Sequence, residues 1–140
     1  MPETKEDARR RNLNRFIHAQ DNGTFYEGTG TYAQALQEVR NGHKSGHWMW
    51  YVFPQLQGQG HSELAQFYGI NGREEAYAYI ANETLRDRLV EITEAVLNNE
   101  KSVYDIFGDD TIKFRSCMRL FASVCDEPVF KKIIAKYRWD

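Results

Sequence analysis

The stretch from Gly46 to Gly60 constrains the fold more than any other part of the chain. It reads GHWMWYVFPQLQGQG and holds two of the three Trp residues of the protein. Its apolar centre, Trp48 to Pro54, would leave a large exposed hydrophobic patch if it stayed in water. We therefore expect this stretch to form the core, with the other elements packed onto it.

Periodicity alone does not assign the secondary structure of this stretch, because Trp48 to Phe53 is apolar on every side. The chain has no second strand-like run to pair with it, and an unpaired buried strand would leave backbone donors unsatisfied. We therefore predict a short helix or turn. It should end before Pro54, because a proline disfavours helical geometry in the residue that precedes it.

The rest of the chain shows helical spacing of apolar residues, separated by turn residues. The pattern and its capping residues predict helices at about 8–20, 31–40, 62–68, 74–80, 82–97, 103–107 and 109–124, and a last one from Pro128. Residues 1–7 are polar and expected to fray. The predicted fold class is all-α: one domain over residues 1–140, a compact array of about seven or eight short helices around the buried Trp-rich segment.

Composition excludes several classes of function. The 18 basic and 20 acidic residues give a net charge of −2, which provides no overall field for binding nucleic acid or an anionic membrane. The chain begins without the apolar region of a signal peptide and has no run approaching the ~20 apolar residues of a membrane span. Its two cysteines, eight residues apart, do not suggest a disulfide framework. We expect a reduced, cytoplasmic setting, no nucleic acid or membrane partner, and no cofactor.

Two catalytic hypotheses compete with simpler interpretations. His43, His47 and His61 could bind a metal ion if a helix placed the first two on one face, but Gly46 and the preceding Asn-Gly pair argue against that helix. We predict no metal site. Cys117 or Cys125 could pair with His47 as a nucleophile, yet both cysteines lie on or beside an apolar helix face, where a small buried side chain is the usual role.

The central motifs resemble those of the bacterial family DUF1810. The matching residues are Arg15-Phe16-Ile17-His18-Ala19-Gln20, Ala35-Leu36-Gln37-Glu38-Val39, Gly42, Lys44, the run His47 to Leu56, Gly58, Gly60, Tyr68-Gly69-Ile70, Ile106-Phe107-Gly108, Asp110, Lys113, Arg115, Ser116, Met118, Leu120 and Phe121. Cys117 and Arg119 depart from the Ser and Thr of the family pattern, which weakens any hydroxyl-based role there. The resemblance implies an all-helical fold and no activity, since the family is uncharacterised. A calpastatin label sometimes given to it has no support in these residues.

We favour a pocket where the Trp-rich run meets the predicted helix that carries Lys113. Aromatic walls with a few convergent polar groups are typical of small-ligand sites, and a cation with an amide suits a phosphate, a carboxylate or the edge of a nucleobase. His47 is the candidate acid or base. The candidate ligand contacts are Trp48, Trp50, Gln55, Lys113, Arg115 and Ser116. The alternative stays open that His47 and Gln55 merely satisfy backbone groups while the cations are solvated.

The hypothesis is therefore a protein that binds a small polar, anionic or nucleotide-like ligand, with or without enzymatic turnover. The competing hypothesis is a non-catalytic protein-interaction module, whose groove would be lined by exposed aromatic residues such as Tyr77, Tyr79 and Trp139. A pocket touching both His47 and Lys113 would favour the ligand hypothesis.

Overall fold

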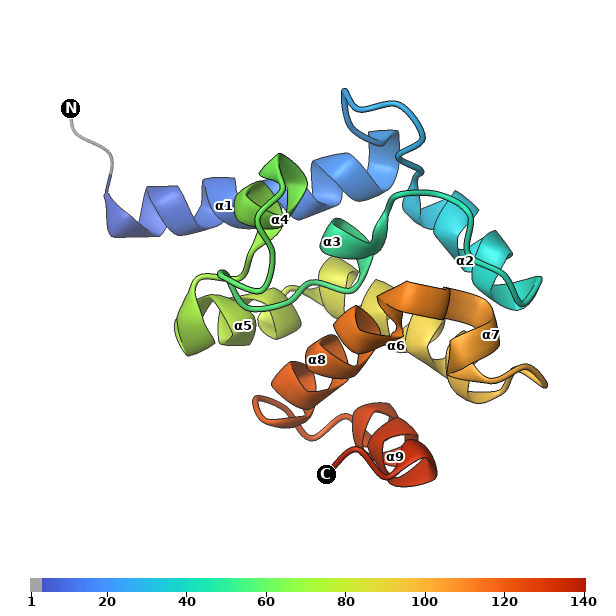
Figure 1. Cartoon of the computed structure of the whole chain (residues 1–140). Helices are drawn as coiled ribbons and strands as arrows, with labels where there is room; N and C mark the ends of the chain where they lie inside the picture. Colours follow the sequence, from blue (N-terminus) through green and yellow to red (C-terminus); the bar gives the residue numbers. More distant parts are fainter. Residues whose placement is uncertain (1–3) are drawn as a thin grey trace.

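A computed structural model describes the backbone of residues 4–140 and the side chains of residue 4 and residues 13–140. The chain folds into short helices joined by loops (Figure 1). The α-helices are α1 (Lys5–Asn22), α2 (Tyr32–Arg40), α3 (Met49–Val52), α4 (Glu63–Tyr68), α5 (Gly72–Ala81), α6 (Glu83–Leu97), α7 (Val103–Phe107), α8 (Thr111–Ala122) and α9 (Pro128–Tyr137), and a 3-10 turn, η1 (Gly108–Asp110), precedes α8. The predicted all-helical fold is confirmed. Among the described residues, β pairing is limited to one isolated bridge between Leu56 and Ile70.

Helix α6 lies among the other elements rather than at the edge of the array. It packs against α2, α5 and α9, and α9 also packs against α8. In Figure 1, α1 and α9 lie at opposite ends of the molecule, with α3 and α8 in front of α6. The apolar face of α6 is buried as its spacing predicts, with Leu85, Leu89, Ile92 and Val96 at most 1% exposed. None of the described helices is long and apolar enough to cross a bilayer.

The Trp-rich segment forms the core as predicted, and it does so around a single helical turn, α3. Trp48, Tyr51 and Phe53 are each 0% exposed. The Phe53 ring lies 6.1 Å from Trp48, 5.6 Å from Phe107 and 5.0 Å from Phe114, measured between ring centroids. Tilted and edge-on pairs of this kind add to the stabilisation that burial of the rings provides. The segment thus joins α3 to α7 and α8.

Most helix ends follow the predicted caps. Thr31 and Ser102 each form a capping box with the residue three positions later, and Pro128 occupies the first turn of α9. The start of α8 differs. We expected the side chain of Asp109 or Asp110 to cap it, but neither provides a capping hydrogen bond. The carboxylate of Asp110 binds two lysines instead, and this difference leads directly to the candidate site.

The N-terminal prediction needs one change. Helix α1 begins at Lys5, three residues before the predicted start, so residues 5–7 of the segment expected to fray are helical. Residues 1–3 lie outside the described part of the chain.

Candidate functional site

A cavity of about 430 Å³ lies beside α3, between the loop that precedes α2, the start of α4 and the start of α8. Its volume falls within the range of small-ligand pockets. The more buried part of the lining consists of Lys44, Met49, Trp50, Asp110 and Lys113. Thr29 and Leu64 are also half-buried, and the exposed part consists of Tyr26, Glu27, His47, Ser62 and Glu63. His47 and Lys113 therefore line the same cavity.

Two lysines converge on one carboxylate in the buried part. The Lys44 Nζ lies 2.8 Å from Asp110 Oδ2, and the Lys113 Nζ lies 2.7 Å from Asp110 Oδ1. The side chain of Lys44 is only 9% exposed, and its ammonium also donates to the Gly46 carbonyl at 2.6 Å. Burial alone would raise the pKa of Asp110, but the hydrogen bonds from Lys113 and Lys44 outweigh it and hold the pKa below its usual value.

The loop 41–48 holds Lys44 in place through backbone and side-chain hydrogen bonds. The Lys44 amide donates to the Ile106 carbonyl of α7 at 2.8 Å. Glu38 Oε1 accepts from the amides of Ser45 and Gly46 and from Trp48 Nε1, at 2.7, 2.8 and 3.0 Å. Burial acts to raise the pKa of Glu38, yet these donors lower it overall. An ionised Glu38 on α2 therefore fixes both the loop and the core tryptophan.

Glycines make room for two side chains of the cavity. A Cβ at Gly60 would lie 2.7 Å from Cη2 of Trp50, and a Cβ at Gly28 would lie 3.0 Å from Cδ2 of His47. Gly28 also adopts φ +79°, which favours glycine, and its carbonyl accepts from the His47 amide at 2.8 Å. The positions of Trp50 and His47 thus depend on glycine at these two sites.

The aromatic face of Trp50 is occupied by a cation. The Lys113 Nζ lies 4.9 Å from the centre of the Trp50 ring, within the range of a cation–π contact. Trp50 is half-buried, so part of its surface remains available to a molecule in the cavity. The site therefore combines an aromatic surface with a fixed positive charge.

The exposed part of the lining is acidic. Glu27 and Glu63 are both exposed, and the Tyr26 hydroxyl donates to Glu63 Oε2. This bond links the loop before α2 to the first turn of α4. Opposite charges thus face the cavity at different depths, lysines in the buried part and glutamates at the rim.

The sequence-predicted site residues do not all meet. His47, Trp50 and Lys113 line the cavity, whereas Trp48, Gln55, Arg115 and Ser116 do not. Trp48 belongs to the core, and Gln55 is 2% exposed with no hydrogen-bond partner for its Nε2. Arg115 is exposed and Ser116 is half-buried on α8.

Sequence reasoning missed Lys44, Asp110 and Glu38 as parts of the site. Lys44 and Asp110 stood within the motifs of the family resemblance, so a signal for them was present. The local sequence predicts that Asp110 caps a helix, because it does not reveal the distant partner Lys44. Glu38 was part of another quoted motif, but only its position on α2 shows that it faces Trp48.

The competing chemistries find less support among the described residues. No group of three or more His, Cys, Asp or Glu side chains there could hold a metal ion. His43 and His47 lie in the loop 41–48, outside any helix. Cys117 is fully buried, and burial raises the pKa of its thiol. Cys125 donates its Sγ hydrogen to the Phe121 carbonyl at 3.2 Å, and burial also raises its pKa.

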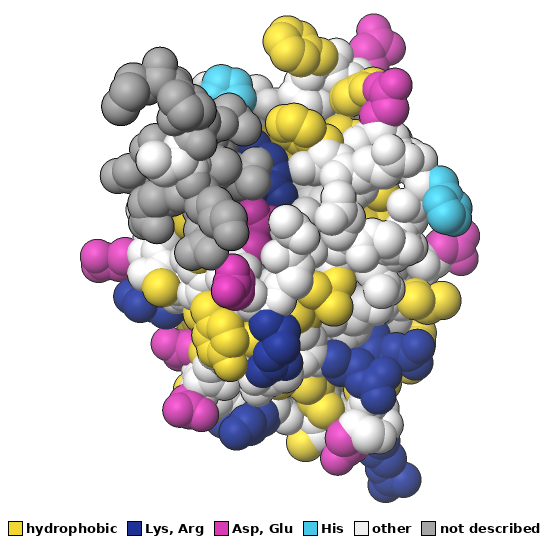
Figure 2. Space-filling view, turned by 90° about the vertical axis from the view of Figure 1, so that its left-hand side faces the viewer, with side chains coloured by type: hydrophobic (Ala, Val, Ile, Leu, Met, Phe, Trp, Pro, Cys, Tyr) yellow, Lys and Arg dark blue, Asp and Glu magenta, His cyan; other side chains and the backbone are white. Residues whose placement is uncertain are grey.

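The interaction hypothesis expected three exposed aromatic residues, and this expectation is wrong for two of them. Tyr79 is 0% exposed and Trp139 is 8% exposed, so both belong to the core. Tyr77 is 49% exposed. On the face drawn in Figure 2, hydrophobic side chains are scattered among polar and charged ones. That face offers no continuous apolar groove of the kind the hypothesis requires.

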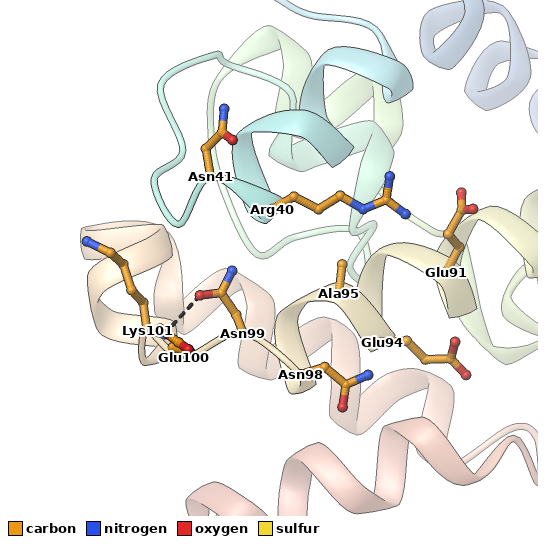
Figure 3. Close-up of a pocket in the computed structure, with 9 residues that line it drawn as sticks. All are labelled: Arg40, Asn41, Glu91, Glu94, Ala95, Asn98, Asn99, Glu100 and Lys101. Atoms are coloured by element: carbon orange, nitrogen blue, oxygen red, sulfur yellow. Dashed lines mark hydrogen bonds between the residues drawn. The ribbon is translucent and has the colours of Figure 1, made fainter.

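A second, larger hollow of about 700 Å³ lies where the ends of α2 and α6 approach the loop 98–102 (Figure 3). Arg40, Glu91, Glu94 and Lys101 contribute charged groups of both signs. These four side chains are exposed, and Figure 3 shows them spread along the surface without a common point of convergence. This hollow lacks the buried charge that distinguishes the cavity beside α3.

Comparison with known proteins gives a family and a fold. The family model described as "Protein of unknown function (DUF1810)" matches residues 10–139. Among solved structures, the crystal structure of the conserved hypothetical protein Rv1873 from Mycobacterium tuberculosis is similar, with a TM-score of 0.82 and 41% sequence identity. The alignment covers 92% of this chain and 89% of that one. No curated protein matches the chain.

Proposed function

Because the chain belongs to the DUF1810 family, whose function is unknown, we propose from the geometry of its own cavity that it binds a small polar ligand, anionic or nucleotide-like, beside α3. One observation carries the proposal. Two lysines, one of them nine-tenths buried, converge on Asp110 in a cavity that His47 and Trp50 also line. Buried charges are costly unless they are paired or used, and polar groups that converge in a pocket are typical of ligand sites.

The residues take distinct roles in this proposal. Lys113 and Lys44 are the anion contacts, and Trp50 provides the flat apolar surface. His47 lies at the rim as the acid or base if the ligand is turned over. Asp110 positions the two ammonium groups.

The other predicted contact residues do not line the cavity and have smaller roles in the proposal. Ser116 follows Lys113 by three residues, so it is a candidate contact for a ligand that extends along α8. Arg115 lies about 200° around the helix from Lys113 and serves a different side of α8. Trp48 supports the wall from the core side, because the Lys44 ammonium lies 5.1 Å from the centre of its ring, whereas Gln55 is buried and does not line the cavity.

A thermal-shift screen of nucleotides and metabolites tests the proposal. A ligand at one hundred times its Kd should add about 2.7 kcal/mol of stability. The shift should be lost in Lys113→Met and reduced in His47→Ala. Lys136→Met is the matched control, because Lys136 also lies over an aromatic ring, 5.5 Å from the centre of Tyr137, but on α9 and outside the cavity.

Two results would contradict the proposal. One is the absence of any stabilising compound across the set. The other is a stabilising compound whose effect is unchanged in both Lys113→Met and His47→Ala, since it would then bind elsewhere on the molecule.

A further inference from the structure

We infer that the ligand is a monophosphate ester of a hydroxyl-bearing molecule, with its phosphate against Lys44 and Lys113 and its hydroxyl groups at the rim. This inference rests on the proposed function and names the class of ligand for the same cavity. It also predicts that di- and triphosphates are rejected.

The hydrogen-bond donors of the two lysines indicate which chemical group the buried part of the cavity would bind. Each ammonium group has three N–H donors. Lys44 uses two of them, on Asp110 and on the Gly46 carbonyl, and Lys113 uses one, on Asp110. One donor on Lys44 and two on Lys113 therefore have no oxygen acceptor, although each ammonium also lies over a tryptophan ring, 5.1 Å from the centre of Trp48 for Lys44 and 4.9 Å from that of Trp50 for Lys113. A phosphate ester offers these donors three terminal oxygens and a charge of about −1.5 to −2, whereas a carboxylate offers two oxygens and a charge of −1.

The charges of the buried part indicate which end of the ligand would lie there. Lys44, Lys113 and the ionised Asp110 leave one net positive charge, with the Lys44 side chain 9% exposed and the Lys113 side chain 35% exposed. An opposite charge is attracted more strongly there than at an exposed surface, because the effective dielectric constant is lower. An anionic group should therefore enter the cavity first and lie deepest.

The negative charges of the rim indicate which groups the exposed end of the ligand would have. Glu27 and Glu63 are exposed acids of the same cavity, and the Tyr26 hydroxyl already donates to Glu63. Carboxylates accept hydrogen bonds from ligand hydroxyl groups but repel further phosphates. A ligand with one terminal phosphate satisfies both parts of the cavity, whereas a longer phosphate chain would carry negative charge to Glu27 and Glu63.

Two kinds of compound, a sugar phosphate and a mononucleotide, fit this description, and the position of Trp50 distinguishes them. A volume of about 430 Å³ suits one compact ligand. A sugar phosphate and a mononucleotide share the terminal phosphate and the hydroxyl groups. Only the mononucleotide has a base that can stack on the part of the Trp50 ring that the Lys113 ammonium leaves uncovered.

Isothermal titration of the full chain with adenosine, AMP, ADP, ATP, ribose 5-phosphate and inorganic phosphate tests the inference. AMP or ribose 5-phosphate should bind at least about tenfold more tightly than adenosine and than ATP, a difference of about 1.4 kcal/mol. Preference for AMP over ribose 5-phosphate, lost in Trp50→Leu, would identify the mononucleotide. Lys113→Met should remove the advantage that the phosphate confers.

A charge-neutralising variant tests the rim separately. Glu27→Gln combined with Glu63→Gln should bring the affinity for ATP closer to that for AMP. The matched control is Glu94→Gln combined with Glu100→Gln, which changes the net charge equally but lies on the second hollow. This control should leave the ratio of the two affinities unchanged.

The inference is overturned if ATP binds as tightly as AMP and ribose 5-phosphate, if adenosine does so, or if both pairs of Glu→Gln substitutions change the ratio equally. A ligand without phosphate that requires His47 and Lys113 would overturn the inference and leave the proposed function standing. The absence of binding by every compound, here and in the metabolite screen, would overturn both.

Discussion

Neighbouring residues of the segment 47–53 lie in two different environments, the buried core on one side and the cavity on the other. Trp48 and Phe53 lie in a dry aromatic cluster and are 0% exposed. His47 and Trp50, one and two positions from Trp48, face a cavity in which Lys44 and Lys113 each lie within hydrogen-bonding distance of Asp110. One short helical turn therefore separates a region that stabilises the fold from a region equipped to bind. Substitutions on the two sides should have separable effects.

The largest expected effect comes from the core side. Phe53→Ala removes a ring that contacts Trp48, Phe107 and Phe114, and should lower the free energy of unfolding by about 3–5 kcal/mol. Urea denaturation measures the loss. Phe67→Ala is the control, because Phe67 is 59% exposed and its loss should cost about 0.5 kcal/mol or less. Similar losses for the two variants would contradict the assignment of Phe53 to the core.

The next effect concerns Glu38, which joins the two sides. Glu38→Ala leaves the Trp48 indole and two loop amides without their acceptor, and should cost about 3 kcal/mol. Glu38→Gln keeps an acceptor oxygen and should cost less. If Glu38→Gln is as unstable as Glu38→Ala, the charge of Glu38 rather than its geometry holds the loop. Chemical denaturation of both variants decides between these outcomes.

Two glycine variants distinguish the backbone strain of a side chain at positive φ from a direct contact with His47. Gly28→Ala and Gly58→Ala both place a side chain at positive φ, +79° and +95°, and each should cost about 1–2 kcal/mol. Only the Cβ at position 28 meets His47, because nothing lies within 4 Å of a Cβ at position 58. The imidazole NMR signals of His47 should therefore move in Gly28→Ala and stay in place in Gly58→Ala. Equal movement in both would mean that Gly28 does not position His47.

The smallest expected effect is a dependence of stability on pH. Glu38 and Asp110 have pKa values below their usual range in the folded protein. Their contribution is therefore fully present above the unfolded values, about 4, and is lost as the pH falls through the lower folded values. It should be smaller than the losses above, because both carboxylates are partly exposed and solvent screens their charges. Denaturation at a series of pH values should give a shallower acid decline in Glu38→Gln and Asp110→Asn than in the wild type.

The sequence predicts the helices better than it predicts the site, for physical reasons that particular residues illustrate. Thr31, Ser102 and Pro128 act on neighbours within a few residues, so their role at helix ends can be inferred from spacing alone. Asp110 satisfies the same local rule, but its carboxylate binds Lys44, a partner far away in the sequence. Such a pairing depends on how α7 and α8 pack against the loop 41–48, which no local pattern encodes.

The candidate contacts show the same limit. Trp48 and Trp50 are equivalent in an all-apolar run, and only the packing of α3 makes one a core residue and the other a cavity residue. Lys113 and Arg115 are similarly alike in charge, yet α8 turns only Lys113 toward the cavity. The sequence predicted that the Trp-rich run would meet Lys113, but not which of the neighbouring residues would take part.

The placement of the three tryptophans has an optical consequence. Trp48 and Trp139 are buried in the core, whereas Trp50 is half-buried in the cavity wall with the Lys113 ammonium over its ring. Indole emission is sensitive to nearby charge and to solvent, so a molecule that moves Lys113 or displaces water from Trp50 should change the intrinsic fluorescence of the unlabelled protein. A Trp50→Phe variant should show a smaller change that comes from Trp48, whose ring centre lies 5.1 Å from the Lys44 ammonium, and its two remaining tryptophans would still report unfolding. The chain thus contains one tryptophan in the cavity wall and two in the core, one of which contacts a lysine of the cavity.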